Sequence, residues 1–397
     1  MSTLRVDAIR HNSATSDAIT TASDGTCTAK LTSIGGGQLS HRNIIINGAM
    51  TVAQRGTSST SSGHYTVDRF KITNTGTDES PTQAQVDVSS GTTPYTSGFR
   101  KALKVTNGNQ TGGAGAGDFI WIQYIVEAQD IATSGWNYTS SSSYVTLSFW
   151  IKSSVAQDFK GYLRSRDGTN YEYPFATGSL SADTWTKVTK TIPGNSNIQI
   201  DNDNEAGFEI NLFPFLGTDR TTDVTEDAWA TYNSSARTRD NTSTWYTTND
   251  ATLEITGVQL EVGDTATSFE HRRYGDVLRD CCRYYQTVPY NLFIIRGSDS
   301  ISYSNAPIQS SFILPELMRS NPTGSNHTDG GSLITVTYYN ASYGSATNYE
   351  AHITNSIHSG TVHFYLGHSQ ANNSGTALST SYKWGQTIDP IAFSAEL

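Results

Sequence analysis

The sequence has few charged residues and no long apolar run. Only 16% of its 397 residues are Asp, Glu, Lys or Arg, and the net charge is −10, whereas charged residues make up about 25% of an average soluble protein. A nucleic-acid-binding surface needs clustered Lys and Arg to neutralise phosphates, and the sequence has no basic run. No apolar stretch approaches the ~20 residues of a membrane-spanning helix. We therefore expect neither nucleic acid nor membrane insertion.

Cysteine is also scarce. The chain has three cysteines, Cys27, Cys281 and Cys282, and the last two are adjacent, where a disulfide would be strained. This is no disulfide framework, so we expect free thiols, as in a protein assembled in the reducing cytosol.

Ser, Thr, Asn, Gly and Tyr replace the missing charges, and this composition favours strands and turns over helices. Between residues 42 and 272, short strands recur between turn residues, as in a sandwich or barrel. Val145, Leu147, Phe149 and Ile151 alternate with polar residues, which predicts a half-buried strand. Residues 119–126 are apolar or aromatic on both faces, which predicts a central strand.

Two motifs about two hundred residues apart bracket this β-rich stretch. The first contains N-x-x-I-N-G from Asn43, Q-R-G from Gln54, and Tyr65 followed by D-R at residues 68–69. The second contains Q-L-E-x-G from Gln259, T-x-F-E-x-R at 267–272 and C-x-R-Y-Y at 281–285. In this order, the motifs resemble the opening and closing signatures of bacteriophage tail-fibre proteins. Pro315–Pro322 and the final I-x-F-x-A-E-L at 391–397 resemble the same family.

The resemblance implies a structural virion component that recognises a host surface glycan. It implies a carbohydrate-binding-module-like jelly roll at 42–272, and a homotrimer in which the segment at 1–41 intertwines in threes and attaches to other virion proteins. Strands on either side of Asp24 and Gly25 are expected in that segment. A capsid head fibre or decoration protein of the same modular type remains an alternative.

The expected fold is mainly β, because the composition favours strands and turns. A chain of this length is also too long for one core, which predicts more than one domain. A second β-sandwich is expected at 287–397, beyond a short connecting helix at 273–286. Within that connector, residues 274–285 carry an apolar stripe at helical spacing. The residues of the stripe are Tyr274, Val277, Leu278, Cys281, Cys282 and Tyr285.

Aromatic residues in polar loops are the candidate receptor-binding residues, since sugar rings stack on aromatic faces and sugar hydroxyls bond to Asn and Ser. Cross-strand aromatic packing is the alternative for each of them. The candidates in the C-terminal region are Tyr338, Tyr339, Asn340, Tyr343, Tyr349, Tyr382 and Trp384. Trp245 and Tyr246 are the candidates in the first sandwich.

Catalytic and metal sites have weaker support. Asp201, Asp203 and Glu205 alternate in a way that could supply oxygen ligands to Ca²⁺, but the stretch lacks the glycine and the distant glutamate of an EF-hand, so an acidic turn is favoured. We expect no cofactor, no metal site and no enzyme activity. A glycan depolymerase, which needs two carboxylates in suitable geometry, is the less favoured alternative.

Overall fold

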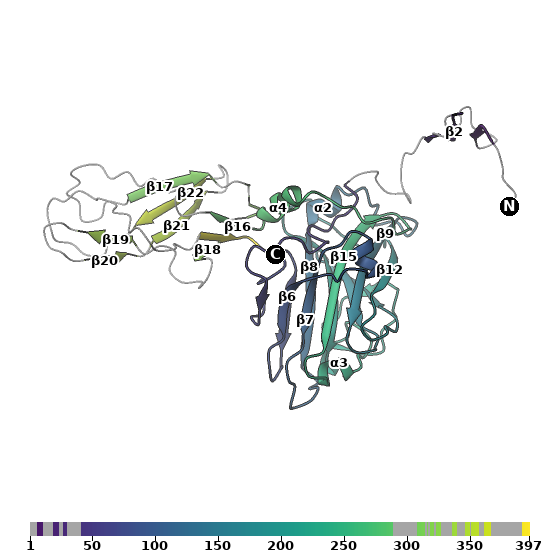
Figure 1. Ribbon diagram of the computed structural model, residues 1–397, viewed down its shortest axis with the longest axis horizontal. Coiled ribbons are helices and arrows are strands. Elements are labelled where there is room, and N and C mark those ends of the chain that lie inside the picture. Colours follow the sequence, from purple (N-terminus) through teal and green to yellow (C-terminus); the bar gives the residue numbers. More distant parts are fainter. Residues whose placement is uncertain are drawn as a thin grey trace.

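The computed structural model describes residues 6–10, 19–23, 27–29, 41–288, 308–313, 316, 318–320, 323–326, 336–339, 346–349, 351–356, 361–366 and 391–397. Its main body is a sandwich of two six-stranded antiparallel sheets (Figure 1). The expected mainly-β sandwich fold is therefore confirmed.

The first sheet has the strand order β14-β11-β10-β13-β8-β5, and the second has the order β12-β9-β15-β7-β6-β4. The strands of the first sheet are β5 Lys71–Thr75, β8 Phe119–Glu127, β10 Lys160–Ser165, β11 Tyr171–Ala176, β13 Ala206–Leu216 and β14 Ala230–Thr231. Those of the second are β4 Ser58–Ser59, β6 Thr82–Asp87, β7 Lys101–Thr106, β9 Tyr144–Ser153, β12 Thr186–Pro193 and β15 Thr252–Val262.

The sandwich core contains the alternating residues that the sequence predicted. Val145, Leu147, Phe149 and Ile151 of β9 are all buried in it. β8 lies between β13 and β5, as expected for a strand that is apolar on both faces. Because successive strand residues point to opposite faces, the rest of each strand points outward from the sandwich.

Short helices connect the strands: α1 Thr93–Thr96, α2 Ala128–Ala132, the 3₁₀ turn η1 Thr218–Arg220, α3 Thr244–Thr247 and α4 Tyr274–Cys282. None of the helices in the described ranges has the length and apolar character needed to cross a membrane.

Helix α4 begins where the sequence predicted but ends three residues earlier. Tyr285 already belongs to β16, because it pairs with the last strand of the chain. Cys281 is buried, whereas the Tyr274 side chain is 59% exposed, so its place in the predicted apolar stripe is wrong. Cys281 and Cys282 are both free thiols.

The N-terminal strands are β1 Ala8–Ile9, β2 Ile19–Thr21 and β3 Cys27–Ala29, and they form a three-stranded sheet in that order. β2 and β3 pair antiparallel, with Ile19 opposite Ala29. The expected strands on either side of Asp24 and Gly25 are confirmed, while these two residues lie outside the described ranges. Intertwining in a trimer stays a prediction.

The C-terminal region is also β. Its strands are β16 Tyr285–Val288, β17 Ile308–Ile313, β18 Thr323–Asn326, β19 Val336–Tyr339, β20 Ala346–Tyr349, β21 Ala351–Ser356, β22 Thr361–Leu366 and β23 Ile391–Ser394. They pair as β16-β23-β18, β17-β22-β21 and β19-β20. Assembly of these sheets into a second sandwich, and the predicted domain limits, stay predictions.

Candidate functional site

The chain leaves the sandwich and returns to it at one place. β16 follows α4 and pairs antiparallel with β23, with Tyr285 opposite Ser394 and Val288 opposite Ile391. β18 pairs with the other edge of β23. β16 and β23, the strands that flank residues 289–390 in the sequence, are therefore held side by side next to the sandwich (Figure 1).

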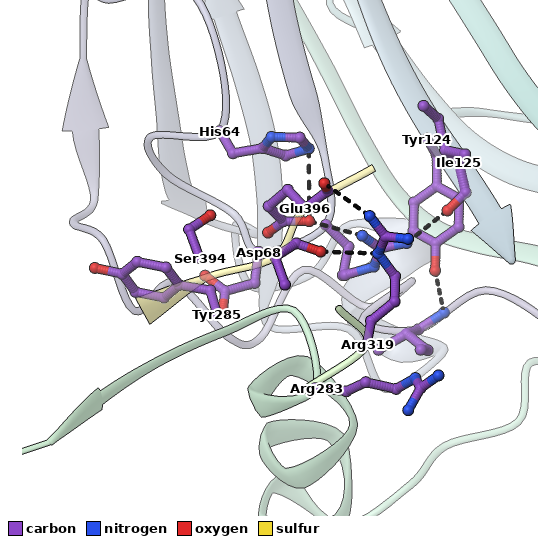
Figure 2. Close-up of polar contacts among 12 residues, drawn as sticks. His64, Asp68, Tyr124, Ile125, Arg283, Tyr285, Arg319, Ser394 and Glu396 are labelled. Atoms are coloured by element: carbon purple, nitrogen blue, oxygen red, sulfur yellow. Dashed lines mark hydrogen bonds and ion pairs between the residues drawn. The ribbon is translucent and has the colours of Figure 1, made fainter. Parts of the chain in front are cut away.

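Beyond β23, Glu396 enters a cluster of basic side chains on the sandwich (Figure 2). Its carboxylate lies 2.7 Å from Nη1 of Arg69, 3.1 Å from Nη2 of Arg55 and 3.8 Å from Nε2 of His64. Burial opposes ionisation of Glu396, but the charges of His64, Arg69 and Arg55 outweigh it and lower its pKa to about 2. The penultimate residue of the chain is thus held as a buried anion.

Arg69 is the centre of this cluster. Its side chain is almost fully buried, and Nη2 also donates to the carbonyl oxygen of Ile125. The guanidinium carbon lies 3.3 Å from the ring centroid of Tyr284 and 5.2 Å from that of Tyr124. One arginine of the first motif therefore joins strand β8, the residues after α4 and the chain end.

Asp68, which precedes Arg69 in the first motif, holds the backbone at Gln54 in place. Its carboxylate accepts hydrogen bonds from the backbone nitrogen of Gln54 at 2.9 Å and from Nε2 of Gln54 at 2.6 Å. The same Nε2 donates to the carbonyl oxygen of Tyr285 at 2.7 Å. Burial raises the pKa of Asp68 to about 6, against the opposing effects of Arg55 and Gln54.

Two further arginines complete the junction. Arg283 makes a bidentate pair with the fully buried Glu127 of β8, with both N–O distances at 2.7 Å. Arg319, from the sequence Pro315–Pro322, donates from Nε to the carbonyl oxygen of Ala395 and from Nη1 to that of Asn204. All four of the recognised sequence signatures therefore meet here. We refer to the cluster of Arg55, His64, Asp68, Arg69, Arg283, Arg319 and Glu396 as the junction.

The remaining motif residues close the sandwich beside the junction. The Glu270 carboxylate accepts from the backbone nitrogens of His41 and Asn43. The Asn43 side chain in turn accepts from Leu260 and donates to the carbonyl oxygen of Val258, both in β15. These contacts join the start of the described main body to its last strand.

A cavity of about 410 Å³ opens between residues 41–46, α2 and α4. Two of its charged lining residues, Arg272 and Asp280, pair with each other. A third, Arg283, pairs with Glu127 beyond the lining.

The predicted receptor-binding residues fall into three groups: residues in paired strands, residues outside the described ranges, and two residues of the sandwich. Tyr338, Tyr339 and Tyr349 lie in the paired strands β19 and β20. Asn340, Tyr343, Tyr382 and Trp384 lie outside the described residues.

Trp245 and Tyr246 are corrected by the structure, because both side chains are 0% exposed. Nε1 of Trp245 donates to the carbonyl oxygen of Thr252 at 3.0 Å. The Tyr246 ring stacks on Phe215, with centroids 4.2 Å apart. Both rings are core residues, so neither is available to a sugar in this structure.

The acidic turn at 201–205 is tied to neighbouring backbone. Asp203 accepts from the nitrogen of Glu205, and the nitrogen of Asp201 donates to Asp167. In the part of the chain that the structure describes, no three His, Cys, Asp or Glu residues lie where they could hold a metal ion.

Comparison with known proteins gives similarity at the level of the β-sandwich. No protein-family model matches the chain, and no curated protein matches it. One similar structure is the enzymatically active domain of tailspike protein 4 of bacteriophage CBA120, at 9% identity and a TM-score of 0.29. That match covers 55% of this chain but only 21% of the tailspike chain.

Two carbohydrate-binding proteins are similar to the same extent. The N-terminal cellulose-binding domain of Cellulomonas fimi β-1,4-glucanase C has 11% identity and a TM-score of 0.27, over 54% of this chain and 99% of that chain. A family 30 carbohydrate-binding module has 11% identity and a TM-score of 0.24, over 56% and 89%. At these scores the similarities carry no argument about function.

Replacing Glu396 tests the junction. Glu396→Gln leaves Arg69 and Arg55 buried without their carboxylate, and breaking such a pair typically costs about 3–5 kcal/mol. We expect a loss of that size in urea unfolding at pH 7, together with faster proteolysis between residues 289 and 390. Asp223→Asn is the control, because its ion pair with Arg239 is mostly exposed. A loss for Glu396→Gln no larger than the control's would contradict this assignment.

The junction also predicts a specific pH dependence. Burial lowers the pKa of His64 to about 4, so its contribution to stability is present above its ordinary pKa of 6.5 and is lost as the pH falls from 6.5 to 4. The raised pKa of Asp68 acts in the opposite direction, since protonation then favours the folded state between pH 6 and 3.8. Each of these two titrations changes the free energy of unfolding by about 3 kcal/mol.

We therefore expect the two effects largely to cancel in the wild type. His64→Gln should leave the Asp68 effect unopposed, so that the free energy of unfolding rises between pH 6 and 4 relative to wild type. Urea unfolding at pH 7.5, 5 and 4 measures this, with the exposed His271→Gln as control. Parallel pH profiles for His64→Gln and wild type would show that the two groups are not balanced in this way.

Proposed function

We propose that the chain is a structural fibre protein of a phage virion that adheres to a glycan of the host surface. The junction is the observation that supports this proposal. It holds the strands that flank residues 289–390 against a stable sandwich, and it is built from the residues that resemble the tail-fibre signatures. An adhesive tip needs such a fixed base, because ordering a mobile binding region on contact reduces affinity.

In this proposal, the sandwich positions the C-terminal region and the N-terminal segment attaches to the virion in a homotrimer. Tyr, Asn, Ser and Gly in the C-terminal region form a mixture suited to recognition, since Tyr supplies contact area at low entropic cost. Three weak sites per trimer, and several trimers per particle, would raise the avidity.

The adhesion proposal is tested with particles that carry tip variants. Alanine at Tyr339, Tyr343 or Trp384 should reduce adsorption to host cells while the melting temperature of the purified full chain stays within a few degrees of wild type. Tyr65→Ala is the matched control, because Tyr65 is an exposed aromatic residue of the sandwich. Equal adsorption by all these variants would argue against recognition by the C-terminal region.

The proposal assigns binding without hydrolysis, and one pair of carboxylates makes this testable. Glu209 forms ion pairs with Arg164 at 3.3 Å and with Arg166 at 2.8 Å. Burial raises the pKa of Glu172 to about 8. Glycosidases also use one protonated and one ionised carboxyl group. Incubation of the full chain with host polysaccharide should release no reducing ends, and release that Glu172→Gln abolishes would show that the chain is an enzyme.

A further inference from the structure

The face of the first sheet that points away from the sandwich core carries both polar and aromatic side chains. An outer sheet face usually carries polar side chains that contact solvent. Asn211 lies directly opposite Gln123 of β8 on one side and Tyr162 of β10 on the other. Thr73 of β5 lies opposite Trp121 of β8. These residues alternate with core residues in their strands, so they share the face that points away from the core.

The segment from Gly217 to Asn241 covers this face. The guanidinium carbon of Arg237 lies 5.1 Å from the ring centroid of Trp121, and the Tyr232 and Tyr162 ring centroids are 6.2 Å apart. β14 pairs with the edge strand β11 through two residues. Trp229 and Glu226 also hold the segment to the sandwich, through the carbonyl oxygen of Pro193 and the ammonium group of Lys160. The segment thus brings one arginine and one aromatic ring onto the face.

Polar groups under the segment are buried without partners. Asn211 is 0% exposed, and neither its Oδ1 nor its Nδ2 has a hydrogen-bond partner. Arg237 is 8% exposed, and its Nε and Nη1 are also unpaired. Of the sixteen buried unpaired side-chain atoms in the described residues, eleven belong to this face and its cover. They are atoms of Thr73, Trp121, Arg164, Glu172, Asn211, Arg220, Arg237 and Asn241.

Such a concentration is energetically unfavourable, because a buried polar group without a partner has lost its hydrogen bonds to water and gained none in return, and an uncompensated charge is more unfavourable still. Natural proteins keep such groups at places where something else supplies the missing partners. The unpaired atoms here include donors from three arginines and an indole as well as amide groups that both donate and accept. A polyhydroxylated ligand offers partners for all of these.

The charge of the face favours an anion. Lys71, Arg164 and Arg166 lie on or beside it, and Arg220 and Arg237 lie in the covering segment. The carboxylates nearby already have partners: Glu209 pairs with Arg164 and Arg166, and Glu226 of the segment pairs with Lys160. By contrast, Arg164, Arg220 and Arg237 each keep a buried N–H group without a hydrogen-bond partner, so the groups that lack a partner here include three cationic side chains.

We propose that this face is a second glycan-binding site, which takes a carboxylate-bearing sugar unit between the first sheet and the segment at 217–241. Arg237 binds the carboxylate, Asn211 and the Trp121 indole bind hydroxyls, and the Trp121 and Tyr232 rings flank the sugar. Because Asn211 is fully covered, the segment lifts to admit the ligand. This inference deepens the proposed glycan binding, but it places a site on the sandwich rather than on the C-terminal region.

The experiment uses the full chain and three acidic hexasaccharides, of galacturonate, mannuronate and glucuronate, each compared with its uncharged methyl ester by calorimetry. At least one acidic hexamer should bind ten-fold or more tightly than its ester, and raising the salt from 20 to 200 mM should weaken that binding. No binding by any of the three acids, or equal binding of an acid and its ester, would overturn the proposal.

Two variants test the residues. Arg237→Gln should weaken binding of the acid hexamer at least ten-fold, whereas Arg239→Gln should leave it within two-fold, since Arg239 is half exposed and pairs with Asp223. Asn211→Leu should remove binding without lowering the melting temperature, because it replaces an unpaired amide by an apolar group of similar size. Unchanged affinity in Asn211→Leu and in folded Arg237→Gln would sink the assignment.

Host-cell binding separates this inference from the proposed function. If the full chain binds host cells but none of the acidic hexamers binds the purified full chain, adhesion stands and this site is wrong. If the acid hexamer binds the wild-type face but the chain does not bind host cells, the site stands and the adhesion proposal is wrong.

Discussion

The ion cluster around Glu396 is the constraint on which the C-terminal half of the structure depends. A carboxylate within 3.1 Å of two buried arginines can remain ionised only while both stay in place. Arg69 in turn is positioned by the Tyr284 and Tyr124 rings and by the carbonyl of Ile125. The chain end, β8 and the residues after α4 are therefore fixed together, and no single one of them can move without exposing a buried charge.

This constraint explains why the signature residues are spread along the chain. Gln54 links Asp68 to the backbone of Tyr285, and Arg283 reaches back to Glu127. Each residue satisfies a partner from another segment, so a substitution at one position leaves a buried group unpaired at another. The motifs describe one three-dimensional cluster rather than separate local structures.

The fold followed from the sequence where local pattern determines it. The alternation in residues 145–151 identified both the strand and its buried face, and residues 274–282 identified the helix. The helical spacing also extends to Tyr285, whose pairing with Ser394 depends on a strand more than a hundred residues away. Trp245 and Tyr246 are flanked by polar residues, a pattern that predicts a surface loop, whereas they fill space between the sheets.

The site was less predictable than the fold. The motifs marked Arg69 and the A-E-L ending separately, but sequence spacing carries no sign that Arg69 and Glu396 form an ion pair. The unpaired groups on the first sheet are hidden for a similar reason. Asn211 and Glu172 look like ordinary outward residues of strands until the segment at 217–241 is seen to cover them, and only the fold shows that arrangement.

The side-by-side pairing of β16 and β23 has a mechanical consequence. Tension applied to the C-terminal region reaches the sandwich both along the backbone through α4 and through the pairing of β23 with β16 and the ion pairs of Glu396. The load is therefore shared between one covalent connection and a set of non-covalent contacts, and the backbone before β16 carries only part of it.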